Sequence, residues 1–233
     1  MDLSQYLTKE QFYLNFISDD RYKFFINGLK VTLTVTLFSV LIGIVIGFLV
    51  GAIRSTYDKT GKMRILDMIC KAYLSIIRGT PVLVQLMIMY FIVFSSPDAN
   101  KMVTAVLAFA INSGAYVAEI FRSGIMSVDN GQFEAGRSLG FNYVQTIWYI
   151  VLPQAFKNAL PALCNEFIAL LKETSVVSFI ALQDLTRAGD LVKSRTYNPV
   201  LPLITVALIY WVVVTILTKL VSILERSLRK NER

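Results

Sequence analysis

The feature that most constrains this chain is an apolar run, residues 31–53, which holds no charged residue between Lys30 and Arg54. An α-helix needs about 20 apolar residues to cross a bilayer, so this run is long enough to span one. The composition agrees, because 55% of the residues are hydrophobic and the mean hydropathy is +0.57, far from the values of a soluble domain. The sequence therefore predicts an all-α integral membrane protein.

Five membrane-spanning helices are expected from the apolar runs. The second run is interrupted at Arg78, Gly79 and Pro81, and the simplest interpretation is a tolerated kink. The fourth is unusual because charged residues lie inside it. The expected spans are about 25–53, 67–95, 102–122, 158–180 and 198–222.

Small residues recur where helices can pack closely. Gly43, Gly47 and Gly51 follow one another at intervals of four in the first span, and a small-residue patch, 113–115, lies in the third. Such stripes let helix backbones approach each other. The neighbour of the glycine stripe can lie in the same chain or in a second subunit, and the sequence leaves both open.

The basic residues indicate an orientation. A net charge of +7 would suggest nucleic-acid binding in a soluble chain, but here Lys and Arg flank apolar runs, so we expect no nucleic-acid partner. They are more frequent after the first and third spans and at the chain end, which is typical of cytoplasmic segments. We expect an external segment at 1–23, a transmembrane domain at 24–225 and a cytoplasmic tail at 226–233.

The longest polar passage of the chain, residues 126–157, separates the third and fourth expected spans. Asn130 is the expected N-cap of a short helix, and Glu134 is expected in its first turn, where a carboxylate suits the positive end of the helix dipole. Gly140 is expected just past the last residue of this helix.

A second short helix is expected directly after the first. Asn142 can cap it, and it should reach Leu152 before Pro153 interrupts it. Two short helices joined at a glycine form an elbow, which between membrane helices suits docking onto a partner. The alternative is a loop with a tight turn.

This passage resembles the EAA loop of ABC-importer permeases, specifically of the polar amino acid permease family. The family pattern is roughly G-Q-x-E-A-A-x-S-L-G, a spacer, and L-P-Q-A. Gly136 replaces the second alanine; it stays small, so a partner can still approach, but it weakens the helix by about 1 kcal/mol. The matching residues are Gly131, Gln132, Glu134, Ala135, Ser138, Leu139 and Gly140, and then Leu152, Pro153, Gln154 and Ala155.

Three further stretches resemble the same family: 78–86, 112–125 and 165–175. The resemblance implies the five-helix core of type I importers, with short cytoplasmic coupling helices in a bacterial or archaeal cytoplasmic membrane. It implies a second permease chain, identical or paralogous, an ABC ATPase dimer and an external amino-acid-binding protein. It also implies alternating access to an amino acid substrate. This chain would hold no cofactor, since ATP and Mg²⁺ would be bound by the ATPase.

Polar residues at membrane depth are candidates for the substrate path, because a charge at the bilayer centre costs about 2.5 kcal/mol or more unless it is paired or hydrated. An amino acid needs opposite polarities close together. Glu166 suits its ammonium, with Asn165 beside it, and Lys172 or a helix N-terminus suits its carboxylate. Alternatives are a structural ion network around Glu166 and snorkelling of Lys172 and Glu173. The candidates are Thr80, Gln85, Asn112, Asn165, Glu166, Lys172, Glu173, Thr174 and Ser175.

Other functions were weighed against these residues. The segment from Gly131 to Ser138 is one residue from a phosphate-binding P-loop, but Arg137 replaces the lysine and no buried strand precedes it. With no histidine and two cysteines, no metal site and no enzymatic site are expected. Buried carboxylates alone would also permit an ion-coupled secondary carrier or a membrane enzyme, although a carrier usually shows internal repeats. A structural scaffold would leave the buried charges unexplained.

Overall fold

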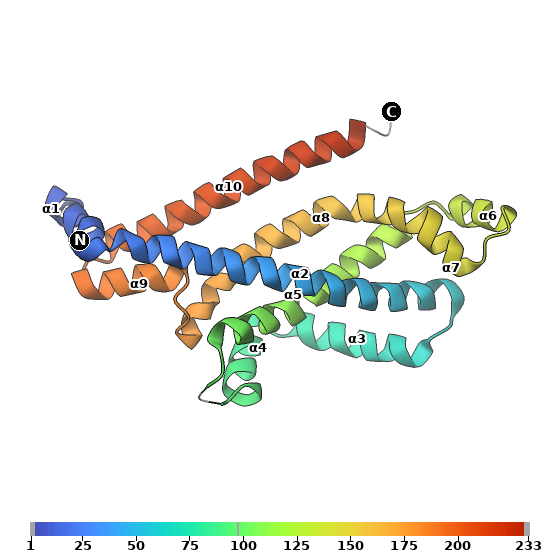
Figure 1. The fold of residues 1–233 in the computed structure, drawn as a ribbon, viewed down its shortest axis with the longest axis horizontal. Helices are drawn as coiled ribbons and strands as arrows, with labels where there is room; N and C mark the ends of the chain where they lie inside the picture. Colours follow the sequence, from blue (N-terminus) through green and yellow to red (C-terminus); the bar gives the residue numbers. More distant parts are fainter. Residues whose placement is uncertain (1–2, 97, 231–233) are drawn as a thin grey trace.

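The computed structural model describes residues 3–96 and 98–230, and within them every regular element is helical (Figure 1). Residues 1, 2 and 231–233, at the ends of the expected external segment and tail, lie outside the described residues. The α-helices are α1 (Lys9–Phe12), α2 (Tyr22–Thr60), α3 (Arg64–Gly79), α4 (Val82–Ile88), α5 (Lys101–Met126), α6 (Asn130–Ser138), α7 (Tyr143–Thr146), α8 (Leu152–Glu173), α9 (Leu185–Thr196) and α10 (Val200–Lys230).

Short 3₁₀ and π segments connect or extend these helices. Three are 3₁₀ helices, at Leu3–Tyr6, Ser18–Asp20 and Thr174–Ile180. Three are π helices, at Tyr13–Ile17, Met89–Val93 and Ile147–Val151. In Figure 1 the N-terminal helices and α9 lie at one end of the long axis, and α6 and α7 lie at the other. The segment between the fourth and fifth expected spans is largely a helix, α9.

The longest helix, α2, packs along α5 through its glycines. A Cβ added at Gly43 would lie 3.2 Å from the backbone nitrogen of Gly114, and one at Gly51 would lie 2.9 Å from the carbonyl oxygen of Ala118. The neighbour of the glycine stripe is therefore in the same chain. This close crossing of two backbones is the use that small residues have in membrane helices.

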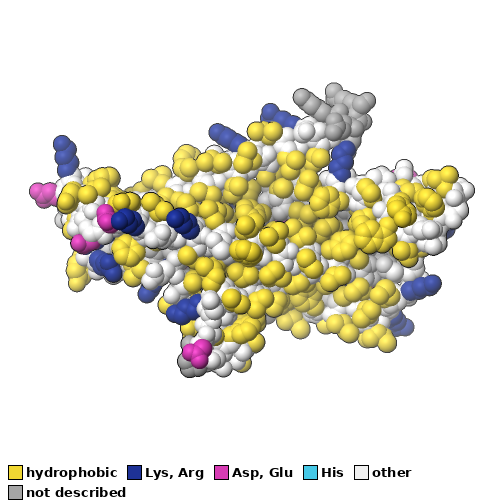
Figure 2. Space-filling view, in the orientation of Figure 1, with side chains coloured by type: hydrophobic (Ala, Val, Ile, Leu, Met, Phe, Trp, Pro, Cys, Tyr) yellow, Lys and Arg dark blue, Asp and Glu magenta, His cyan; other side chains and the backbone are white. Residues whose placement is uncertain are grey.

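The main core forms where α2, α4, α5, α8 and the 3₁₀ segment Thr174–Ile180 meet. Val35, Leu86, Phe109 and Leu170 are completely buried there. Outside this core, large apolar side chains remain exposed along the middle of the molecule, and they cover most of the face seen in Figure 2. Such a surface is stable in lipid and is not expected of a soluble monomer.

The second expected span is broken more sharply than predicted. Helix α3 and the pair formed by α4 and the π segment Met89–Val93 meet at 107°, so the interpretation as a tolerated kink is wrong. Pro81 disfavours the helical conformation for the residue before it. Thr80 is accordingly extended, with φ −125° and ψ 147°.

Among the described residues, three helices are long and apolar enough to cross a membrane by length and composition: α2, α5 and α10. The bent pair of α3 and α4 counts as a fourth if it forms one span. Helix α8, at the expected fourth span, is not among them, because its charged residues lower its hydropathy. It starts at Leu152, earlier than the expected residue 158, and after Glu173 the chain continues as a 3₁₀ helix.

Candidate functional site

Helix α6 begins at Asn130, the residue expected to be its N-cap. The carboxylate of Asp129 accepts a hydrogen bond of 2.6 Å from the backbone N–H of Gly131, so Asp129 is the N-cap. The expectation for Asn130 is therefore wrong, and Glu134 falls beyond the first turn. Both residue types can cap a helix, so residue type alone does not decide which of two neighbouring positions is the cap.

The end of α6 is built as expected, on Gly140. Its φ is +82°, in the left-handed region that glycine adopts without strain. Its N–H donates to the carbonyl of Arg137 at 2.9 Å, and the N–H of Phe141 donates to that of Gly136 at 3.0 Å. This pair of bonds is a Schellman motif, and it fixes the angle between the two arms of the elbow.

The second arm starts with a complete capping box at Asn142. Its side chain accepts from the N–H of Gln145, and the Gln145 side chain accepts from the N–H of Asn142, both at 2.9 Å. The expected interruption at Pro153 does not occur, because helical structure continues from α7 through the π segment into α8. The switch to wider turns at Ile147–Val151 accommodates the missing N–H of the proline.

Gly136 is the one buried residue among the predicted coupling positions. A Cβ there would lie 2.7 Å from both Cγ2 and Oγ1 of Thr146. The close approach that this small residue permits is thus made within the chain, between α6 and α7, and not by a partner. Gln132 is half-buried, and the exposed coupling positions are Gly131, Glu134, Ala135, Ser138, Leu139, Gly140 and Pro153.

Apolar side chains add to the exposed face of the elbow. Leu139 and Tyr149 are each 72% exposed. Both lie in the elbow, which is held by the turn at Gly140 and the capping box at Asn142. The Tyr149 ring lies 6.1 Å from that of Phe141. Large apolar groups on a rigid surface are typical of a protein docking site.

Three of the predicted substrate-path residues meet at the break between α3 and α4. The Asn112 amide donates to the side-chain oxygen of Gln85 at 2.9 Å. The Gln85 amide in turn donates to Oγ1 of Thr80 at 2.8 Å and to the carbonyl of Ile77 at 2.7 Å. Gln85 thereby satisfies carbonyl groups that the broken helix leaves unpaired, so its contacts here are structural.

The other predicted path residues lie on and after α8. Glu166 accepts a hydrogen bond of 2.9 Å from Ser113, the neighbour of Asn112 on α5. Asn165, Lys172 and Glu173 are exposed, and Ser175 is half-buried. Thr174 is buried and donates to the carbonyl of Leu171 at 2.8 Å. The structure therefore joins Glu166 to α5 through Ser113 and joins Gln85 to α5 through Asn112, and Lys172 takes part in neither contact.

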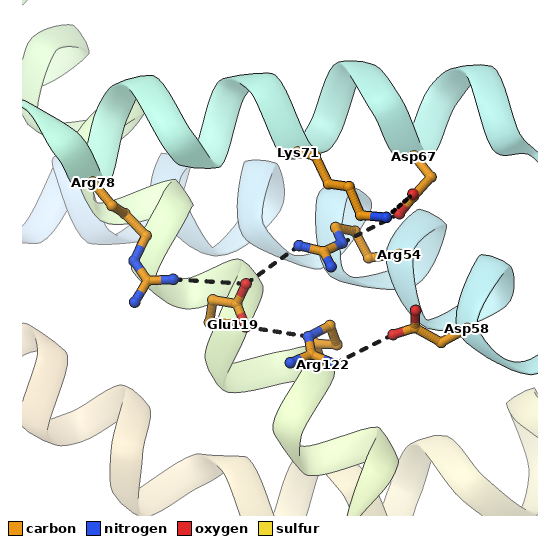
Figure 3. Close-up of polar contacts among 7 residues, drawn as sticks. All are labelled: Arg54, Asp58, Asp67, Lys71, Arg78, Glu119 and Arg122. Atoms are coloured by element: carbon orange, nitrogen blue, oxygen red, sulfur yellow. Dashed lines mark hydrogen bonds and ion pairs between the residues drawn. The ribbon is translucent and has the colours of Figure 1, made fainter.

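A charged network that sequence analysis missed joins α2, α3 and α5 (Figure 3). Its centre is Glu119, whose carboxylate lies 3.5 Å from Arg54, 3.7 Å from Arg78 and 3.2 Å from Arg122. These three arginines come from three different helices. From the sequence, Arg54 and Arg122 are interpreted as markers of orientation and Arg78 as part of the interruption of the second span. Helix spacing can pair Glu119 with Arg122, three residues on, but nothing in the pattern pairs Glu119 with Arg54 or Arg78.

The network extends from Glu119 toward the loop between α2 and α3. Asp67, whose side chain is 2% exposed, lies 2.7 Å from Lys71 and 3.3 Å from Arg54. The contact between Nε of Arg54 and Oδ1 of Asp67 is an ion pair without hydrogen-bond geometry. Arg122 also contacts Asp58 at 3.2 Å. Ion pairs thus hold α3, a helix with few buried residues, against the rest of the molecule.

One polar groove lies near the charged network. A groove of about 600 Å³ lies between α5 and α8, lined by Glu119, Ser123, Ser127 and Asn158 among others. Within residues 3–96 and 98–230, no group of three or more His, Cys, Asp or Glu side chains is placed to hold a metal ion.

Comparison with known proteins decides the family. The sequence profile described as "Binding-protein-dependent transport system inner membrane component" matches residues 39–230. The chain belongs to this family. The matched region contains the elbow, the Gln85–Asn112 contact and the charged network.

Individual relatives are permeases named for amino acids. The chain is 38% identical over 175 residues to a putative glutamine transport system permease of Rickettsia typhi, covering 74% of this chain and 80% of the relative. It is 42% identical over 176 residues to the arginine transport system permease ArtQ of Bacillus subtilis, covering 75% and 80%.

Solved structures confirm the expected fold, that of a type I importer permease. A chain of the "crystal structure of an amino acid ABC transporter with histidines" matches with a TM-score of 0.82 and 42% identity, covering 91% of this chain and 98% of that one. A chain of the MetNI methionine ABC transporter matches with a TM-score of 0.75 over 95% and 99%. At 19% identity, this second likeness shows the fold alone.

Proposed function

We propose that this membrane component takes up polar amino acids in an ATP-driven importer. The support is the identity of 38–42% to permeases named for glutamine and arginine, over about three quarters of the chain. Family membership favours this function over the ion-coupled carrier and the membrane enzyme that isolated buried carboxylates would permit. The partners would be an ABC ATPase dimer, a second permease chain and an external amino-acid-binding protein.

The observation that carries the coupling proposal is the exposed elbow held by a cap at each arm. Gly140 sets its angle, and Leu139 and Tyr149 present apolar groups on its surface. A rigid protrusion with exposed apolar side chains suits a groove on the ATPase. The elbow transmits force rather than binding nucleotide, so ATP and Mg²⁺ belong to the partner.

The proposed orientation places the elbow in the cytoplasm. Helices α6 and α7 lie at the end of the molecule opposite the N-terminal helices and α9 (Figure 1). Because Lys and Arg favour the cytoplasmic side, the excess of these residues in and around the elbow supports a cytoplasmic elbow and tail. The N-terminal segment and α9 are then external.

The proposed substrate path passes Glu166. The Glu166 carboxylate accepts a hydrogen bond from the neutral hydroxyl of Ser113. Its remaining lone pairs are available to a ligand. An amino acid ammonium would use these lone pairs. The same contact also fits a purely structural role for Glu166 between α5 and α8, and the two roles make different predictions about uptake.

Transport assays of Glu166 variants separate these roles. The complex would be reconstituted with its ATPase and binding protein, and uptake of radiolabelled cationic, neutral and anionic amino acids would be measured for Glu166→Gln and Glu166→Ala. Glu10→Gln, at an exposed residue of the N-terminal segment, is the matched control. A path role predicts weakened uptake or altered selectivity in an assembled complex. Unchanged uptake and selectivity in both variants would remove Glu166 from the path.

A further inference from the structure

One lysine at the end of α2 contacts the first arm of the elbow in two ways. The Lys59 ammonium donates a hydrogen bond of 2.7 Å to the side-chain oxygen of Asn130. It also lies 4.7 Å from the ring centre of Phe133, within the range of a cation–π interaction. Asn130 and Phe133 are three residues apart on α6 and so share one face of that helix.

These contacts explain why Asn130 is not the N-cap. Asp129 performs the capping, which leaves the Asn130 side chain available to Lys59. Lys59 is itself half-buried, and the exposed coupling positions such as Ser138 and Leu139 lie elsewhere on the elbow. Lys59 therefore binds the side of α6 and leaves its outer surface accessible to a partner.

The second arm of the elbow also touches α2. Thr56 and Tyr143 line one cavity of about 210 Å³ between α2 and α7. Burial raises the pKa of the Tyr143 hydroxyl, while a hydrogen bond with Thr56 lowers that pKa by less. Because Thr56 lies one turn before Lys59, the last turns of α2 contact both arms.

The opposite end of α2 is held just as closely. A Cβ at Gly28 would lie 2.6 Å from the carbonyl oxygen of Asp184, so the two backbones are in direct contact. The N–H of Leu185 donates to Oγ1 of Thr32 at 3.2 Å. Helix α2 thus joins the elbow at one end to the start of α9 at the other.

Helix α2 can transmit a displacement because it is one unbroken element. It has 39 residues, which at 1.5 Å per residue gives about 58 Å. It contains no proline, the commonest cause of a sharp kink. A movement imposed on α6 can reach α2 directly through the side chains that join the two helices, and Lys59 makes two of those contacts.

We propose that Lys59 is a positioning residue that couples the first arm of the elbow to α2, so that movement of the elbow on its ATPase also moves the external end of α2. This inference rests on the proposed importer function. It assigns to Lys59 neither substrate binding nor ATPase binding. Its loss should therefore reduce the transport obtained per ATP while leaving assembly intact.

The test uses Lys59→Met, which keeps the length of the side chain and removes both contacts. Lys59→Arg retains the charge and the cation–π partner, and Lys62→Met is the matched control at a nearby exposed lysine. Each variant would be reconstituted in proteoliposomes with the ATPase and binding protein. The readouts are assembly by size-exclusion chromatography, ATP hydrolysis, and amino acid uptake per ATP.

We expect Lys59→Met to assemble and to lower uptake per ATP by about fivefold, the scale of losing the contacts of one charged side chain at a surface. Lys59→Arg and Lys62→Met should stay near the wild-type ratio. A wild-type ratio in Lys59→Met would overturn the inference, as would reduced assembly with an unchanged ratio.

Two further variants keep the test decisive if Lys59→Met does not assemble. Asn130→Ala and Phe133→Leu each remove one contact, and both should lower uptake per ATP in assembled complexes. Unchanged ratios in both would overturn the inference. If the wild-type complex itself shows no ATP-driven uptake, the proposed importer function fails, which is a different result from normal coupling in the Lys59 variants.

Discussion

The side-chain amide of Asn112, in the middle of α5, donates a 2.9 Å hydrogen bond to Gln85 across the break between α3 and α4. Asn112 is 3% exposed, and removing its amide leaves the side-chain oxygen of the half-buried Gln85 without this partner. We predict that Asn112→Leu destabilises the protein by about 1–3 kcal/mol. The measurement is thermal unfolding in detergent, with Asn158→Ala, an exposed asparagine of α8, as control. Equal melting temperatures for Asn112→Leu and wild type would show that the contact contributes nothing.

The charged network should depend far more on Glu119 than on Arg78, the arginine with the most exposed side chain of the three. Glu119→Gln removes the charge shared by three guanidinium groups and should cost about 1–3 kcal/mol, less than a fully buried pair would because Glu119 is 25% exposed. Arg78→Gln should cost at most about 1 kcal/mol, since its side chain is 44% exposed and its contact is 3.7 Å. Unfolding in detergent measures both. Equal losses would refute a network centred on Glu119.

The packing of Gly136 against Thr146 predicts non-additive mutations. Gly136→Ala places a Cβ 2.7 Å from the Thr146 side chain and should destabilise the elbow by about 1–3 kcal/mol. Thr146→Ala alone loses the hydrogen bond from Oγ1 to the Asn142 carbonyl. The double variant should lose less stability than the sum of the single variants, because the clash is gone. Strict additivity would mean that the two residues do not interact.

The proposed orientation can be tested by labelling. In a background with Cys70 and Cys164 replaced, cysteines at Lys62 and Ser138 should react with a membrane-impermeant maleimide only from the cytoplasmic side. A cysteine at Asp98, which is exposed after the π segment that follows α4, should react from outside. If Ser138→Cys reacts from outside intact cells, the proposed topology is inverted.

Much of this fold can be predicted from short stretches of the sequence. Charge-free runs predicted α2 and α10, and Gly140 and Asn142 predicted the turn and the second cap of the elbow. These signals act over a few residues, so no knowledge of the rest of the fold was needed. The family resemblance then supplied the arrangement of the helices.

Other features depend on contacts that the sequence does not display. The 107° bend at Pro81 exceeds what a proline alone requires, and it is held by Gln85 and Asn112, which are 27 positions apart. Asp129 caps α6 in place of Asn130, whose side chain accepts a hydrogen bond from Lys59. Pro153 fits within a continuous helix because the preceding turns widen. In each case a distant or neighbouring residue decides between two locally acceptable structures.

The account's central claim, that the elbow couples this permease to an ATPase, is tested most directly by amino acid uptake in proteoliposomes carrying Gly140→Val. Gly140 has φ +82°, and an added Cβ would meet no atom within 4 Å. The substitution therefore strains only the backbone, by about 1–2 kcal/mol, and Gly140→Asn, which tolerates that conformation, is the control. We predict that the valine variant assembles with its ATPase but loses most ATP-driven uptake, while the asparagine variant keeps it. Normal uptake by an assembled Gly140→Val complex would contradict the claim.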